Sequence, residues 1–327
     1  MKGDLVPSPL LPARSGGFPV PAIIAGAGEK ASEHFLEFFA ATIRNTHTRR
    51  AYSRAVTEFM AWCHHYGLES LLDIEPLHVA TWIEAQVKAD CAAPSVKQRL
   101  AALRHLFDWL VVGQIVPTNP AASVRGPQHI LKGGKTPVLD PAEARALLAS
   151  IDISTPVGLR DRALIALMVY SFARVGAALG MKVEDVYTQS RRLWLRLHEK
   201  GGKAHKMPCH HNLEEYLTAY IDGCGLRDDP KGPLFRTIPN RGGQLTRTAM
   251  EQPDAYRMIG RRATEAGIGT KVGNHSFRAT GITAYLKNNG TLEKAAAMAN
   301  HASTRTTQLY DRRHEEMSLD EVERIGI

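Results

Sequence analysis

Apolar positions in the first third of the chain recur with the spacing of one face of an α-helix. A helix is predicted from Thr46 to near Gly67, and its apolar face consists of Tyr52, Val56, Phe59, Met60 and Cys63. A second helix is predicted after Pro76 and a third from near Pro94. These patterns indicate a small all-helical domain over roughly residues 29–116.

Proline and glycine interrupt the apolar pattern over the next stretch, so residues 117–137 are predicted to form an interdomain linker. A second domain is then expected over residues 138–327. Asp140 is a predicted N-cap, and Pro141 follows at the first helical position. Helices are predicted over 141–150 and 159–172.

Residues 193–197 (Leu-Trp-Leu-Arg-Leu) alternate as a β-strand does and predict one, and residues 205–209 are predicted to return as a second strand. The paired glycines of Lys200-Gly-Gly-Lys203 favour a hairpin turn between them. The chain after residue 210 has mostly helical patterns. The predicted fold class is mainly α with a small antiparallel β-sheet.

Composition restricts the functional class. With 327 residues, 44% of them hydrophobic, the chain can bury two cores, and a net charge of +8 favours a polyanionic partner. No apolar run approaches 18 residues, and prolines interrupt the first 28 residues, which are expected to be a flexible arm. The four cysteines form no C-x-x-C pair, so reduced thiols and a cytoplasmic location are expected.

Several residues with phosphate chemistry lie in the second domain. His275 and Arg278 are three positions apart, so on a helix both side chains can reach one phosphate. His301 lies nine residues before Tyr310, and Arg174 follows the predicted apolar helix. Each of these residues alone is weak evidence for a phosphate site, whereas their order and spacing together are stronger evidence.

In these features the chain resembles the tyrosine recombinases, the phage integrases and Xer-type enzymes. Residues 160–164, leading to Arg174, resemble the first arginine box of the family, and His275-x-x-Arg278 resembles the second. Asn300-His301 stands where the family usually has Gly-His, and Tyr310 has the spacing of the nucleophile. Lys200 to Lys203 resembles the hairpin lysine segment, and Thr46-x-x-Arg49-x-x-Tyr52 resembles the core-binding domain.

The resemblance implies a helical core-binding domain, a mixed α/β catalytic domain and a set of catalytic roles. Tyr310 is the expected nucleophile, and the two arginines hold the nonbridging phosphate oxygens. His275 is the expected base and His301 a donor to the phosphate, while Lys200 is the expected acid for the 5′-oxygen. The catalytic set is Arg174, Lys200, His275, Arg278, His301 and Tyr310.

The expected partner is a double-stranded DNA recombination site. Candidate DNA-binding residues are Arg49, Arg50, Arg54, Lys97, Gln98, Arg104 and Lys203. The resemblance implies a homotetramer on paired sites, strand exchange through a Holliday junction and a C-terminal helix that docks on a neighbouring protomer. Accessory DNA-bending proteins are further candidate partners. No metal and no other cofactor is expected, because the phosphotyrosine conserves the bond energy.

Two alternatives stay open from the residues. One is a relaxing enzyme resembling type IB topoisomerases, which shares the chemistry but acts as a monomer. The other is a non-enzymatic DNA-binding protein with a degenerate active site. The one departure that favours it is Ala177, which occupies a position three residues after the first arginine where the family commonly has an acid.

Overall fold

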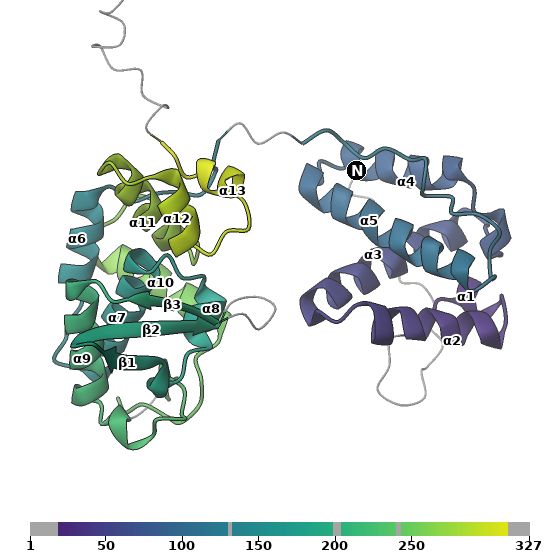
Figure 1. Cartoon of the computed structure of the whole chain (residues 1–327). Coiled ribbons are helices and arrows are strands. Elements are labelled where there is room, and N and C mark those ends of the chain that lie inside the picture. Colours follow the sequence, from purple (N-terminus) through teal and green to yellow (C-terminus); the bar gives the residue numbers. More distant parts are fainter. Residues whose placement is uncertain (1–18, 130–132, 199–203, 240–242, 313–327) are drawn as a thin grey trace, which may run out of the picture. The chain divides into compact units, whose positions relative to one another are not determined.

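The computed structural model describes residues 19–129, 133–198, 204–239 and 243–312 (Figure 1). The chain divides into two compact units, Met1–Ile130 and Leu131–Ile327. Each unit has its own hydrophobic core. The fold is mainly helical with one small antiparallel sheet, as the sequence predicted.

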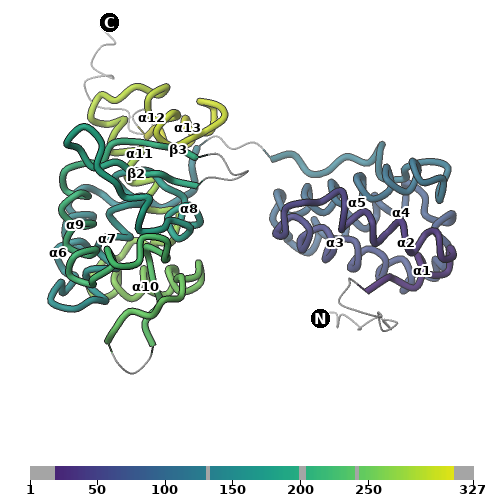
Figure 2. The backbone as a smooth tube through the Cα atoms, turned by 60° about the horizontal axis from the view of Figure 1, so that its bottom comes forward, coloured from purple at the N-terminus to yellow at the C-terminus, as the bar shows by residue number. Residues whose placement is uncertain are grey.

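The first unit is a helical bundle. Its elements are α1 (Ala22–Ala25), α2 (Glu29–Glu37), a π-helical turn (Phe38–Thr42), α3 (Thr46–His65), a 3₁₀ turn (Leu71–Asp73), α4 (Pro76–Lys88) and α5 (Ala93–Val112). Helix α5 packs against α2, α3 and α4, which Figure 2 shows as neighbouring coils. The three predicted helices are confirmed. The ring of Phe59 lies edge-on to those of Trp82 and Phe107 in the centre of this core.

The core of the first unit also includes apolar residues that precede α2 and follow α5 along the chain. Ile23 and Ile24 are buried before α2, and Ala121 and Val124 are buried after α5. The Arg104 side chain donates to the carbonyl oxygen of Ala121 across 3.1 Å. The chain that leaves α5 is therefore fixed to the first unit as far as Val124.

The second unit combines helices with a three-stranded sheet. Its elements are α6 (Pro141–Ala149), α7 (Pro156–Tyr170), α8 (Val175–Leu179), a 3₁₀ turn (Val183–Asp185), β1 (Val186–Gln189), β2 (Arg192–His198), β3 (Ala204–Pro208), α9 (His211–Gly223), a 3₁₀ turn (Leu226–Asp228), α10 (Gln252–Glu265), α11 (Ser276–Lys287), α12 (Leu292–Met298) and α13 (Thr304–Gln308). Asp140 caps α6 with its carboxylate, as predicted.

The sheet has the order β1-β2-β3, and both pairings are antiparallel. Leu195 and Leu197 of β2 are buried, which explains the alternation that predicted this strand. The two predicted strands are confirmed as β2 and β3. Strand β1 was not predicted, because its turn to β2 contains Ser190 and Arg191 in left-handed conformations instead of glycine. The predicted turn at Lys200 to Lys203 lies outside the described residues.

Helix α7 forms the centre of the second unit and packs against α9 and α11. Gly281 allows α11 to lie directly against the end of α7, because a Cβ atom there would be 2.0 Å from the carbonyl oxygen of Val169. This close approach places the first turn of α11 beside the residues that follow α7. Five of the six candidate catalytic residues lie on these two segments and on the chain after α12.

The cysteines have no disulfide partners: all four are free thiols. Burial raises the pKa of Cys63 and that of Cys209 to about 12 each, so neither thiol is reactive at neutral pH. None of the helices in the described ranges is long and apolar enough to cross a membrane.

Candidate active site

Arg278 is fixed by backbone carbonyls on both sides. It lies in the first turn of α11, three residues after the N-cap His275, and only 2% of its surface is exposed. Its guanidinium donates to the carbonyl oxygens of Phe172 and Ala299. Phe172 has a left-handed backbone with φ 54°, which is unusual for a bulky residue and is typical of functional sites. Arg278 therefore joins the chain after α7 to the chain after α12.

His301 is positioned by the end of α12. Asn300 adopts a left-handed conformation with φ 47°, and the His301 backbone N–H donates to the carbonyl oxygen of Ala296 across 2.9 Å. This pattern is a Schellman motif, which needs a residue that tolerates positive φ. Asparagine does so better than most residues, which explains how Asn300 replaces the usual glycine of the family.

The two ring nitrogens of His301 have different partners. Nε2 lies 2.7 Å from Nη2 of Arg278, and Nδ1 lies 2.8 Å from Oγ1 of Thr307. Since a guanidinium can only donate, Nε2 accepts and Nδ1 carries the proton. Burial, together with the charges of Arg278 and Arg174, lowers the pKa of His301 to about 4. His301 is therefore neutral at physiological pH.

Tyr310 lies beside this pair. Its ring stacks on that of His301 with the ring centroids 5.9 Å apart and the planes 10° from parallel. The hydroxyl of Thr283 on α11 donates to the Tyr310 carbonyl oxygen across 2.9 Å. Half-buried Tyr310 also packs against a small apolar cluster that includes Phe172 and Ile282. Contacts within the second unit therefore hold both the backbone and the ring of Tyr310.

Arg174 and His275 complete the arrangement. Arg174 is the N-cap of α8, and its charge acts on both histidines. The His275 side chain reaches the surface, and partial burial followed by the charges of Arg278 and Arg174 lowers its pKa. The structure therefore brings together five of the six predicted catalytic residues, whereas Lys200 lies outside the described residues.

Ala177 is a buried part of α8, 5% exposed. An acid at this position would add a negative charge near Arg174 and the histidines. Without it, the charged groups that shift the pKa of His275 are two arginines, and both favour the neutral imidazole. The substitution is consistent with a site that keeps its histidines uncharged.

Three residues of this site were not predicted from the sequence. Thr307 is fully buried against His301, Thr283 bonds the Tyr310 carbonyl, and Arg312 donates to the carbonyl oxygens of Gly134 and Thr136. Only Thr283 had a signal in the sequence that could have identified it, because it is a polar residue on an otherwise apolar face of α11. The other two lie in short segments without a clear period.

The predicted DNA-binding residues of the first unit have different surroundings. Arg50, Lys97 and Gln98 are exposed. Arg49 donates to the carbonyl oxygen of Ile43. Arg54 pairs with Glu58 at 2.7 Å, and the guanidinium of Arg104 is bonded to backbone carbonyls. Contact with DNA stays a prediction for all six. Lys203 lies outside the described residues.

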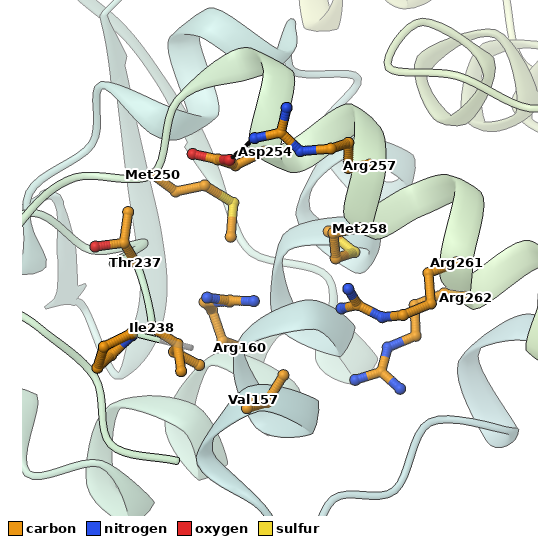
Figure 3. A pocket seen from close by; sticks show the side chains of 11 residues that line it. Val157, Arg160, Thr237, Ile238, Met250, Asp254, Arg257, Met258, Arg261 and Arg262 are labelled. Atoms are coloured by element: carbon orange, nitrogen blue, oxygen red, sulfur yellow. Dashed lines mark hydrogen bonds and ion pairs between the residues drawn. The ribbon is translucent and has the colours of Figure 1, made fainter. Parts of the chain in front are cut away.

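A cavity of about 470 Å³ lies at the other end of α7 from Arg174 (Figure 3). Arg160 of α7 faces it, with Arg261 and Arg262 of α10 on one side and Ile238 on the other. All three arginines pair with the fully buried carboxylate of Asp161. The start of the predicted arginine box is therefore an ionic link between α7 and α10.

No cluster of three or more His, Cys, Asp or Glu that could hold a metal ion occurs among the described residues. The polar groups around Tyr310 are instead arginine, histidine and threonine side chains. Arginines of this kind supply fixed positive charge to a phosphate.

The chain is similar to curated tyrosine recombinases over most of its length. Tyrosine recombinase XerC of Xanthomonas campestris pv. campestris (strain B100) is 26% identical over 295 residues, covering 89% of this chain and 87% of that protein. Tyrosine recombinase XerC of Escherichia coli O127:H6 (strain E2348/69 / EPEC) is 26% identical over 262 residues, covering 79% and 83%.

Solved structures share the fold. XerH site-specific recombinase bound to palindromic difH substrate matches with a TM-score of 0.66 at 19% identity, over 90% of this chain and 87% of that chain. A lambda integrase tetramer bound to a Holliday junction matches with a TM-score of 0.66 at 16% identity, over 89% and 79%. The phage integrase N-terminal SAM-like domain matches residues 33–113, and the phage integrase family matches residues 137–317. The second match spans more than half of the chain, and the chain therefore belongs to the phage integrase family.

Proposed function

We propose that this protein is a site-specific DNA recombinase that cleaves and rejoins DNA through a 3′-phosphotyrosyl intermediate. The proposal rests on one observation above all: the Tyr310 ring stacks on His301, and His301 is bonded to Arg278. A phenol, an imidazole and a guanidinium from three separate sequence motifs thus meet in one place. Membership of the phage integrase family and similarity to XerC support the same activity.

The chemistry follows from the residues. The phenolic oxygen of Tyr310 attacks the phosphorus of a DNA phosphodiester, the bond to the 5′-oxygen breaks, and a 3′-phosphotyrosyl bond forms. Arg174 and Arg278 hold the nonbridging oxygens, where charge increases in the transition state. Attack by a 5′-hydroxyl on the phosphotyrosine reverses the step, so strands are resealed without an external energy source.

Proton transfers fall to the remaining residues. A phenol has a reference pKa of about 10, so it needs a base, and the neutral imidazole of His275 takes that role. Lys200 supplies a proton to the 5′-oxygen. Nε2 of His301 is an acceptor in the present arrangement, so His301 donates to the phosphate only after the proton on Nδ1 is exchanged for one on Nε2 and the bonds to Arg278 and Thr307 are released.

The two units take different tasks in this proposal. The first unit binds the DNA site through its basic residues, and the second carries the chemistry, with the chain between them as linker. Four protomers pair two sites, and the similarity to a lambda integrase tetramer bound to a Holliday junction supports this stoichiometry. The C-terminal segment, which lies outside the described residues, docks on a neighbouring protomer. The protein acts in the cytoplasm.

The deciding experiment compares the wild type with Tyr310→Phe on a nicked suicide substrate containing the target site. The wild type should form a covalent adduct visible on a denaturing gel, and the variant should bind equally well and form none. An adduct at the wild-type level in Tyr310→Phe would refute the assignment. Linear duplexes with and without paired sites separate a recombinase from a topoisomerase-like enzyme, because only a recombinase joins two sites.

A further inference from the structure

The first residues of the second unit lie against the chain on both sides of Tyr310. A Cβ atom added at Gly134 would lie 2.0 Å from the carbonyl oxygen of Leu309, the residue before Tyr310. Nη2 of Arg312, two residues after Tyr310, donates to the carbonyl oxygens of Gly134 at 2.6 Å and Thr136 at 3.1 Å. Residues 134 and 136 thus support the nucleophile segment from one side.

The same stretch is attached to α11 a few residues later. The Leu139 backbone N–H donates to Oγ1 of Thr280 across 3.0 Å, and both groups are buried. Thr283, one turn further along α11, donates to the carbonyl oxygen of Tyr310. The segment from Gly134 to Leu139 and the start of α11 therefore hold the backbone of Tyr310 between them.

We propose that Gly134 and Arg312 are positioning residues for Tyr310: together they set where its hydroxyl stands relative to the arginines. This inference rests on the proposed function. Neither residue contacts the phosphate in this role. Gly134 permits the contact with the Leu309 carbonyl, and Arg312 maintains it by bridging two carbonyls of the opposite segment. Both bonds come from Nη2, which carries two hydrogens at the end of a rigid planar group, so the flexible ammonium of a lysine can replace the bridge only in part.

The expected effect is on the rate of cleavage. At Gly134 the obstructing atom belongs to the backbone of Leu309, so an added methyl group must displace the chain next to the nucleophile. A displacement of about 1 Å in a reacting group can reduce the rate by roughly 100-fold. DNA affinity should hardly change, because neither Gly134 nor Arg312 is among the residues proposed to contact DNA.

The test measures single-turnover cleavage of a nicked suicide substrate together with the Kd for the same DNA. Gly134→Ala and Arg312→Ala should each slow adduct formation by roughly 10- to 100-fold with an unchanged Kd. Arg312→Lys should recover part of the loss. The double variant should be little slower than the worse single variant, because both changes disrupt one contact. Gly260→Ala is the matched control, since a Cβ there meets no atom within 4 Å.

Wild-type cleavage rates in both Gly134→Ala and Arg312→Ala would overturn the inference and leave the proposed function intact. A parallel loss of affinity and cleavage in both would also overturn it. If Gly134→Ala lowers the melting temperature strongly, the result with Arg312→Lys decides the question. Slower cleavage at an unchanged Kd supports the inference, and cleavage at the wild-type rate contradicts it. A wild-type protein that forms no adduct would instead count against the proposed function.

Discussion

Nη2 of Arg278 donates to Nε2 of His301 across 2.7 Å, and this contact determines the protonation of the imidazole. With Nε2 accepting from a permanent cation and Nδ1 donating to Thr307, His301 has both nitrogens engaged and no net charge. Arg278 lies in α11 and His301 in the loop that follows α12, so the contact also fixes the end of α12 relative to α11. An incoming phosphate would compete for the guanidinium of Arg278.

Thr307→Val should slow cleavage by up to about tenfold while DNA affinity is retained. The valine keeps the buried shape but removes the acceptor for Nδ1 of His301, and a hydrogen bond of this kind is worth roughly 0.5–1.5 kcal/mol. Single-turnover adduct formation measures the effect. The exposed neighbour Thr306, changed to valine, is the control. Equal rates in the two variants would show that the orientation of His301 does not depend on Thr307.

Stability without DNA should fall between pH 6.5 and 4 partly because of His301. Its pKa is lowered to about 4 in the folded protein, so in this interval the unfolded chain binds a proton that the folded one does not. The contribution of neutral His301 to the free energy of unfolding is complete above pH 6.5. It is lost as the pH falls through the pKa of about 4 in the folded protein. Melting temperatures at pH 7 and 5 should drop further for the wild type than for His301→Gln. An equal drop contradicts the expectation.

Cleavage should persist in EDTA and need no nucleotide. The positive charge of Arg174 and Arg278 serves the phosphate in the way that a metal ion does in other phosphoryl-transfer sites. Adduct yield on the suicide substrate is compared with and without chelator. Activity that disappears with chelator and returns with Mg²⁺ would mean that the arginines are insufficient.

Lys200, rather than Lys203, should supply the proton to the leaving group. A substrate with sulfur at the 5′-bridging position releases a thiolate, which needs no proton. That substrate should restore cleavage by Lys200→Ala and leave any defect of Lys203→Ala unchanged. Selective rescue of the Lys203 variant would transfer the role to that residue.

Deletion of residues 317–327 should preserve binding of a single protomer and abolish cooperative assembly and strand exchange. The sequence Ser318-x-x-Glu321 has the pattern of a capping box and is combined with apolar Leu319, Val322 and Ile325, which predicts a short helix. A helix of this length is expected to need a receiving surface to form. Band-shift titration and a recombination assay measure the two properties. Full recombination by the shortened protein would show that the segment is dispensable.

Long periodic segments and chemical motifs were predictable from the sequence. The apolar period gave helices α3 to α7 within a few residues, and five motif residues meet as the family spacing implies. Strand β1 was missed because its four residues carry no alternation and its turn lacks glycine. The contact between Gly134 and Leu309 was missed because it joins residues 175 positions apart, and only the fold determines such a pairing.

The ion-pair cluster at Asp161 should tolerate substitution of an arginine better than substitution of the aspartate. One buried carboxylate serves Arg160, Arg261 and Arg262, so the loss of any one arginine leaves it two partners. Removing the carboxylate leaves three guanidiniums facing one another, two of them largely shielded from water. The attachment of α10 to α7 can therefore tolerate the loss of one arginine, whereas it depends entirely on the one carboxylate of Asp161.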